Sequence, residues 1–139
     1  MTKKFILTCL LIFIFLNSNS YGEDNRYFEF DKGIVTLMYH RFNEHKYPST
    51  NIQMDIFKEQ INIIENLDIN YLHPKNLKEE ISKPNKVKKI LLTIDDGFQS
   101  FYDNAWPILK KENIPFILFI STAYVGKKGY MNWKQIKEV

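Results

Sequence analysis

The sequence has almost no cysteine: among its 139 residues, only Cys9 carries a thiol. Cys9 lies in an apolar run near the N-terminus and follows Thr8, where a lipoprotein signal requires glycine, alanine or serine. A disulfide framework and a zinc site built from cysteines are therefore excluded for the rest of the chain. We expect its stability to come from packing or from a metal held by other side chains.

Signatures of nucleotide and nucleic-acid binding are missing as well. The chain has only five glycines and no glycine-rich phosphate loop, which argues against a nucleotide site. It contains no internal repeat and no low-complexity tract. The lysine-rich stretch 82–89 has no aromatic side chain between its charges, so it indicates a solvated connection rather than a nucleic-acid patch.

Residues 1–22 have the order of a cleaved secretory signal peptide. Two lysines precede an apolar run at 5–16, and small and polar residues follow it before Glu23. A membrane anchor is the alternative, but about 20 apolar residues are needed to cross the hydrocarbon core of a bilayer. We therefore expect cleavage after Gly22 and export to the cell envelope or the extracellular space.

The mature chain would be close to neutral. The leader contains two of the 19 basic residues and none of the 16 acidic ones, which leaves 17 against 16 and a net charge of +1. A polyanionic partner such as nucleic acid is therefore not indicated. Residues 23–33 form a polar and aromatic N-terminal segment, and 34–139 are enough for one modest domain.

The residues with the clearest chemistry are at 89–100, where an apolar strand ends in two adjacent carboxylates. The composition of 90–94 is typical of a strand buried on both faces, and Asp95 and Asp96 follow it directly. Adjacent carboxylates repel each other, so the pair must face water, a basic side chain or a metal cation. Gly97 permits a positive φ, and the next residues fit a loop that enters a helix.

Two other interpretations of this acidic pair stay open. Asp96 could cap the following helix or turn while Asp95 is merely solvated. Paired acids at a strand end also bind Mg²⁺ in cytoplasmic phospho-receiver domains, although the signal peptide argues against a cytoplasmic protein.

The residues around the acidic pair resemble a known family. The run Thr-Ile-Asp-Asp-Gly-Phe at 93–98, followed by 104–109 and the apolar run 114–120, is similar to NodB-type polysaccharide deacetylases, carbohydrate esterase family 4. Ile94 replaces the phenylalanine that is usual in the first motif of that family. The Met-Tyr-His ending at 38–40 resembles the branch of exported poly-N-acetylglucosamine deacetylases.

The resemblance implies an α/β fold, the N-terminal portion of a distorted (β/α) barrel, over 34–139. It implies that Asp95 is the general base that takes a proton from the attacking water. It also implies that Asp96 is a ligand of a divalent metal, Zn²⁺ first, with Co²⁺ or Ni²⁺ as alternatives. The implied substrate is an N-acetylated polysaccharide, which the enzyme would deacetylate, in possible association with the cell surface. Because carboxyl ends of barrel strands line the site, His40 is expected on the same face as the acidic pair.

Only part of the family's site is expected in this chain. The resemblance implies two more metal ligands from a His-x-x-x-His motif, and the three histidines, His40, His45 and His73, do not have that spacing. The alternative interpretation of His40 is a loop histidine that only forms hydrogen bonds. His45 and His73 are expected to be structural. The expected function is a secreted metal-dependent deacetylase present as a fragment. The alternative is a non-catalytic remnant of the same fold that at most binds glycan.

Periodicity predicts the elements around this strand. A first strand is expected over 34–39, an amphipathic helix over 54–67, a third buried strand over 115–120, and a helix that opens at Asn132. Asn104 is expected to cap the helix after the acidic pair, which would place a proline in its first turn. The stripe buried by helix 54–67 is expected to hold Phe57, Ile61 and Ile64, widened by Ile56, Ile63 and Leu67. Four aromatic residues are expected to form one cluster that packs in the core, with sugar stacking as the alternative: Phe98, Phe101, Tyr102 and Trp106.

Overall fold

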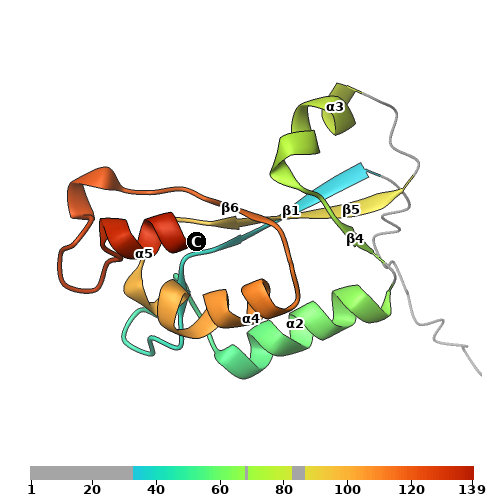
Figure 1. Cartoon of the computed structure of the whole chain (residues 1–139). Coiled ribbons are helices and arrows are strands. Elements are labelled where there is room, and N and C mark those ends of the chain that lie inside the picture. The colour runs from blue at the N-terminus through green and yellow to red at the C-terminus, as the bar shows by residue number, and fades with distance from the viewer. Residues whose placement is uncertain (1–32, 68, 83–86) are drawn as a thin grey trace, which may run out of the picture.

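The computed structural model describes residues 33–67, 69–82 and 87–139, and it contains a parallel sheet with helices packed on it (Figure 1). The predicted signal peptide and residues 23–32 of the N-terminal segment lie outside the described residues. Within the three described ranges, no helix is both long enough and apolar enough to span a membrane.

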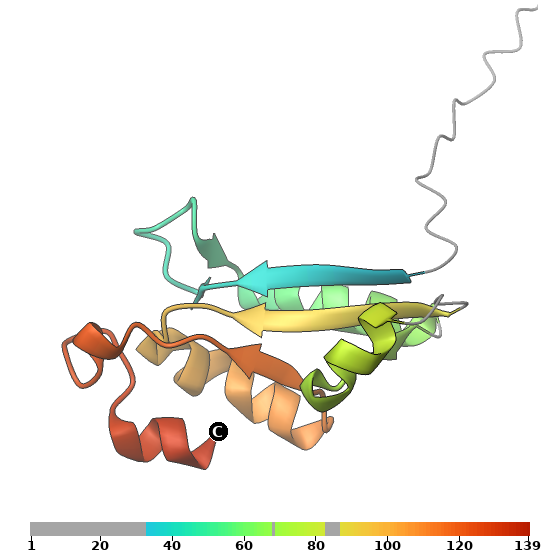
Figure 2. The same cartoon turned by 90° about the horizontal axis from the view of Figure 1, so that it is seen from above.

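The sheet is built around β5, Lys88–Ile94. On one side, β1, Gly33–Tyr39, pairs with β5 along its whole length. On the other side, β4, Asn70–Tyr71, pairs with the beginning of β5, and β6, Phe116–Leu118, pairs with its end. Figure 2 shows β1, β5 and β6 running in the same direction, so that their carboxyl ends meet at one edge of the sheet.

Strand β5 is the buried strand that the sequence predicts. All five residues from Ile90 to Ile94 are at most 7% exposed. A central parallel strand has strand neighbours on both edges and is covered on both faces, so an uninterrupted apolar run is its usual sequence. The two carboxylates that follow β5 therefore lie at the end of the most buried strand described.

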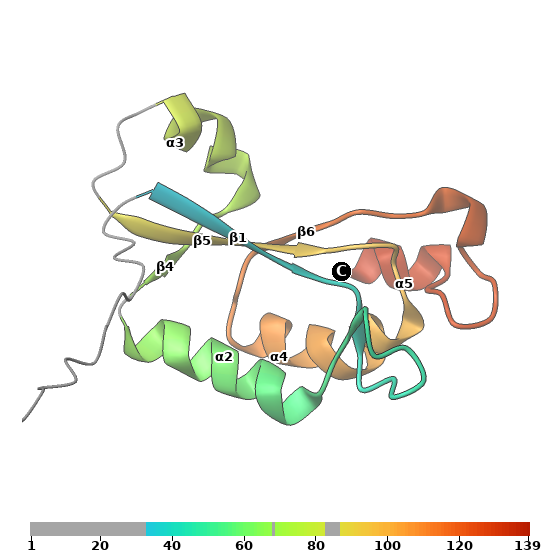
Figure 3. The ribbon, with the colours of Figure 1, turned by 180° about the vertical axis from the view of Figure 1, so that it is seen from behind.

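Helices cover the two faces of the sheet unequally. Figure 1 and Figure 3 show α2, Met54–Asn66, and α4, Trp106–Lys111, on one face, and α3, Leu77–Ser82, on the other, near the beginning of β5. The last helix is α5, Trp133–Glu138. It begins as predicted, because the side chain of Asn132 accepts a hydrogen bond from the amide of Gln135 at 3.0 Å in a capping box.

An aromatic cluster fills the core between the sheet and helices α2 and α4. Phe42, Phe57 and Phe101 have no exposed surface. The ring centroid of Phe42 lies 5.1 Å from that of Phe57 and 5.9 Å from that of Phe101. Phe42 belongs to β2, Arg41–Phe42, which pairs with β3, Asn51–Ile52. The cluster therefore joins the segment after β1 to both helices.

The buried stripe of α2 is narrower than predicted. Phe57, Ile61 and Ile64 are buried, as expected. The expected widening of the stripe is wrong: the residues that should widen it are exposed, Ile56 at 45%, Ile63 at 48% and Leu67, at the C-cap, at 63%. A helix that packs on one sheet face buries only the stripe that points toward the sheet, and no other described element covers its neighbouring stripe.

Two adjacent isoleucines of α2 provide a matched test of this packing. Ile64→Ala should lower the free energy of unfolding by about 2–5 kcal/mol, because it removes buried methyl groups and leaves a cavity. Ile63→Ala should change it by about 0.5 kcal/mol or less, because that side chain already faces solvent. Urea denaturation of both variants measures the difference. Equal losses in the two variants would contradict the orientation of α2.

The helix after the acidic pair begins earlier than predicted. A π-helical turn, Phe101–Ala105, continues directly into α4, so Asn104 lies inside the helix and the prediction that it is the N-cap is wrong. The amide of Trp106 donates to the carbonyl of Phe101, five residues back. This wider turn suits Pro107, which has no amide hydrogen and whose ring crowds an ordinary helical turn.

Strand β6 differs from the buried strand predicted over 115–120. It spans only Phe116–Leu118, and all three residues are half-buried. The reason is its place in the sheet: β5 pairs with one edge of β6, and no described strand pairs with the other. A run as apolar as that of a central strand is thus found on an edge strand.

The burial of Tyr39 leads us to expect a loss of stability at alkaline pH. Burial raises the pKa of Tyr39 from 10.0 to about 12. The folded chain therefore keeps this proton where the unfolded chain has lost it, so the stabilisation is complete below pH 10 and declines as the pH rises from 10 toward about 12. Tyr39→Phe should retain its fold to a higher pH in circular dichroism. Unfolding at the same pH would contradict this.

Candidate active site

Asp95 and Asp96 lie in the turn that follows β5, at the carboxyl edge of the sheet. The amide of Asp95 donates to the carbonyl of Tyr39 at 2.8 Å, which extends the β1–β5 ladder by one residue. Asp96 and Gly97 both have a φ of +71°. The sequence predicts this conformation for Gly97 but not for Asp96, where a β-carbon makes it strained. Such strain persists only when the surroundings hold the turn in place.

Ser121, just beyond the end of β6, holds Asp96 in this conformation. Its hydroxyl donates to Oδ1 of Asp96 at 3.0 Å, and its amide donates to the carbonyl of Asp96 at 3.5 Å. The side chain of Asp96 thus accepts from Ser121 rather than capping the next helix, whose N-cap is Ser100. Sequence reasoning missed Ser121. The one available signal was its position directly after a strand parallel to β5.

Asp95 has a buried oxygen without a partner. Its Oδ1 is enclosed and accepts no hydrogen bond from the described residues. A buried carboxylate oxygen is costly unless a hydrogen-bond donor or a cation satisfies it. The interpretation of Asp95 as a merely solvated acid therefore does not describe this oxygen, for which the described residues supply no partner.

The two carboxylates line a small hollow of about 120 Å³. Its other walls are Phe119, Ile120 and Ser121, all from the segment after β6. A water molecule takes about 30 Å³ in the liquid, so the hollow has room for an ion and a few waters. Its size and its two acids fit the chemistry of a hydrated divalent cation.

His40 shares the edge of the sheet with the acidic pair but does not line its hollow. The pairing of Tyr39 with Ile94 places His40 level with Asp95 on the neighbouring strand. His40 instead lines a separate hollow of about 380 Å³, together with residues of β3 and α2. In the described part of the chain, the sequence-predicted site residues are therefore brought to one edge, and only the two acids are brought into one hollow.

The two remaining histidines are bonded within their own loops, as expected. A ring nitrogen of His45, Nδ1, lies 3.1 Å from Nε2 of Gln53. Nδ1 of His73 accepts from the amide of Lys75 at 3.2 Å and caps a short 3₁₀ turn, Pro74–Asn76. Neither histidine lines the hollow of the acidic pair.

The described residues fit one side of a metal site. Asp96 presents an oriented carboxylate, and Asp95 presents an unsatisfied oxygen beside it. Within 33–67, 69–82 and 87–139, no group of three or more histidine, cysteine, aspartate or glutamate residues could hold a metal ion. Catalytic zinc usually has three protein ligands, so further ligands would have to come from residues other than these.

Comparison with known proteins agrees with this geometry. The family described as "Polysaccharide deacetylase" matches residues 82–139. The poly-beta-1,6-N-acetyl-D-glucosamine N-deacetylase of Staphylococcus epidermidis is 26% identical over an alignment 156 residues long. The alignment covers 94% of this chain and 53% of that protein.

Two solved structures share the fold. IcaB from Ammonifex degensii has a TM-score of 0.70 at 31% identity, over 77% of this chain and 48% of its own. The deacetylase PplD of Streptococcus pyogenes has a TM-score of 0.64 at 28% identity, over 77% of this chain and 51% of its own. The chain thus spans about half the length of these relatives. It is related to the polysaccharide deacetylases, and its parallel sheet corresponds to part of their (β/α) barrel.

Proposed function

We propose that this chain provides the acidic side of the active site of a secreted, metal-dependent polysaccharide deacetylase. The observation that carries the proposal is the turn after β5, where Asp96 is fixed in a strained conformation and Asp95 has a buried oxygen without a partner. The relative from S. epidermidis acts, by its name, on poly-β-1,6-N-acetylglucosamine. We propose the same class of N-acetylated polysaccharide as the substrate here.

The two carboxylates have different tasks in this proposal. Asp96, oriented by Ser121, would hold a divalent cation, Zn²⁺ first and Co²⁺ or Ni²⁺ as alternatives. When bound, such a cation polarises the acetamide carbonyl and makes water more acidic. Asp95, which lines the hollow beside Asp96, takes the proton of the attacking water with its carboxylate. The departing amine then needs a proton, and among the described residues that line the hollow, Asp95 and Asp96 are the only acids.

A non-catalytic, glycan-binding remnant is the second candidate. The absence of a complete ligand group in the described part of the chain favours it. The two candidates differ in what the acidic turn can do when the rest of a deacetylase site is supplied. An intact turn should restore catalysis, whereas a remnant should not.

The test is a chimera with the S. epidermidis relative. Residues 33–139 would replace the segment that they match, and acetate release from β-1,6-linked N-acetylglucosamine oligomers would be measured with added Zn²⁺. We expect metal-stimulated release that disappears in the Asp95→Asn chimera. A folded chimera without release would refute the proposed function and support the remnant.

Export of the mature chain is a separate proposal. It rests on the basic, apolar and small-residue order of residues 1–22. The prediction is that a secreted product begins near Glu23. N-terminal sequencing of material from the medium and the cell envelope measures this, and a product that starts at Met1 would contradict it.

A further inference from the structure

A column of rings around one guanidinium lies beside the acidic turn. The Cζ atom of Arg41 is 3.5 Å from the ring centroid of Phe98 and 4.0 Å from that of Tyr47. The ring centroid of Tyr130 lies 4.9 Å from that of Phe98 and 4.9 Å from that of Tyr124. We call these five residues the ring column. It joins three segments that are far apart in the sequence.

Phe98, in the middle of the ring column, is not available as a sugar platform, although Tyr47 and Tyr124 at the two ends are 39% and 47% exposed. Stacking on a sugar requires an accessible ring face, but Phe98 is only 4% exposed between Arg41 and Tyr130. At the far end, Nζ of Lys127 lies 4.8 Å from the ring centroid of Tyr124. Phe98 packs here rather than with Phe101 in the main core, which corrects the expectation that they form one cluster. The geometry favours a role in holding the loops together.

Arg41 connects the segment after β1 to the acidic turn. Its side chain is only 15% exposed, and its guanidinium forms an ion pair with Glu44 at 3.0 Å. Its amide donates to the carbonyl of Thr50 at 3.0 Å, which closes the loop 43–50. Phe98, on which the guanidinium stacks, is two residues after Asp96. A single side chain therefore spans from this loop to the turn.

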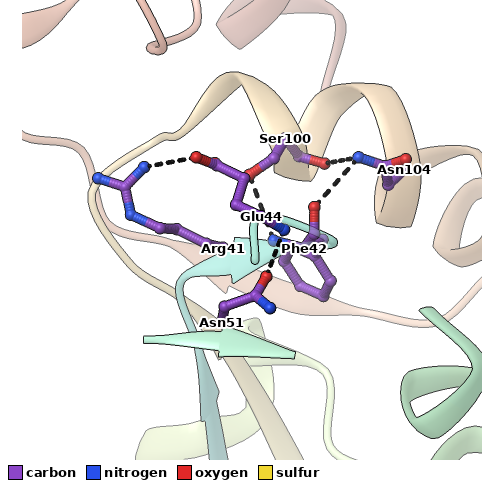
Figure 4. A network of polar contacts seen from close by, with 6 residues as sticks. All are labelled: Arg41, Phe42, Glu44, Asn51, Ser100 and Asn104. Carbon is purple, nitrogen blue, oxygen red and sulfur yellow. Dashed lines mark hydrogen bonds and ion pairs between the residues drawn. The ribbon is translucent and has the colours of Figure 1, made fainter. Parts of the chain in front are cut away.

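Other hydrogen bonds hold the backbone of the same segment in place next to Arg41 (Figure 4). The amide of Phe42 donates to Oγ of Ser100 at 3.2 Å. The side-chain amide of Asn104 donates to the carbonyls of Phe42 and Ser100 at 3.3 and 3.0 Å. The segment after β1 is thus tied to the helix that follows the turn, independently of the ring column.

The turn is held on its opposite side by the segment that carries Tyr130. The amide of Met131 donates to the carbonyl of Gly97 at 2.9 Å, and the amide of Gln99 donates to the carbonyl of Gly129 at 2.9 Å. Asp96 is strained, with a φ of +71°. Strain of this kind is released when a support is removed, and the contact of Arg41 with Phe98 is one of the supports, beside Ser121 and the segment that carries Tyr130.

We propose that Arg41 is a positioning residue for the acidic turn. Its guanidinium, whose Cζ lies over the rings of both Tyr47 and Phe98, fixes Phe98 and thereby keeps Asp96 in the left-handed conformation that Ser121 also holds. Lysine should not replace it, because a compact ammonium cannot fill the flat space between two rings. The catalytic meaning of this role rests on the proposed function, whereas the conformational claim does not.

The test uses the full chain and two variants of Arg41. In Arg41→Met and in Arg41→Lys, we expect amide hydrogen exchange at 97–99 to become about tenfold faster, while exchange in β5 stays unchanged. The three-bond HN–Hα coupling of Asp96, which reports its φ, should shift toward an averaged value in both variants. The matched control is Lys110→Met, which removes a cation 5.4 Å from the ring centroid of Trp106, away from the turn.

Several outcomes would overturn the proposal. One is wild-type exchange and coupling in Arg41→Lys, which would show that charge alone suffices. Another is an equal acceleration throughout the chain, which would show a general loss of stability. A third is the same local change in Lys110→Met. Because neither metal nor substrate is present in these measurements, their failure would leave the proposed deacetylase function untouched, and failure of the chimera would leave this result untouched.

Discussion

Asp95→Asn and Asp96→Asn should each strongly reduce deacetylation in the chimera, and for different reasons. Asp95→Asn is expected to keep the metal and to lower turnover by about 10²–10⁴-fold, because the change removes a base but no ligand. Asp96→Asn is expected to lower the metal content, because a neutral amide is a much weaker ligand for a divalent cation than a carboxylate. Both changes preserve side-chain shape, so the turn should stay folded.

Metal content and turnover measured on the same preparations separate these roles. Atomic absorption gives the metal per chain, and acetate release gives the turnover. In Asp96→Asn, the amide oxygen can still accept the hydrogen bond from the hydroxyl of Ser121. A loss of metal in this variant would therefore come from the lost charge and not from a lost contact with Ser121. Equal loss of metal in both variants would contradict the division of roles between the two carboxylates.

The 139-residue chain by itself should show no metal-stimulated deacetylation. Its described residues contain no group of three ligands, and one oriented carboxylate holds zinc too weakly for catalysis. The measurement is acetate release from N-acetylglucosamine oligomers after addition of Zn²⁺, Co²⁺ or Ni²⁺, with the Asp95→Asn chain as the control. Release that depends on both the metal and Asp95 would show that a complete site exists in this chain.

The same chain is expected to be poorly soluble. In the described sheet, β1 and β6 each pair on one edge only, and Met38 and Phe119 beside these edges are 61% and 53% exposed. An open hollow of about 680 Å³ adjoins β6, and its walls include Leu109 and Phe116. Unpaired strand edges next to apolar surface favour aggregation. Light scattering of the purified chain would detect it.

Local sequence patterns were sufficient to predict the strands and helices that position the acids. The run 90–94 is apolar except for Thr93 because β5 is covered on both faces, and Asp95 and Asp96 follow where this burial ends. The start of α5 at Asn132 could be predicted because the residues that determine it are close in sequence. In each case, the determining interactions are local or follow from burial alone.

Features that depend on distant partners could not be predicted in this way. Ser121 contacts Asp96 only because β6 lies beside β5, a pairing between segments about 25 residues apart. The exposed side of α2 looked buried because Ile63 is as apolar as Ile64, and only the described packing distinguishes them. The contact of Arg41 with Phe98 likewise joins the segment after β1 to the turn after β5, two parts of the chain that are far apart in sequence. Each of these features depends on contacts between segments that are distant in the sequence, so the pattern of one segment could not predict it.

The position of bound zinc in the chimera tests the central claim most directly. A crystal of the zinc-loaded chimera, measured at the zinc absorption edge, would locate the ion by its anomalous scattering. The account predicts a peak about 2.0–2.2 Å from a carboxylate oxygen of Asp96, with Asp95 beside it and not among the ligands. A peak remote from the turn after β5, or one bound by Asp95 in place of Asp96, would contradict it.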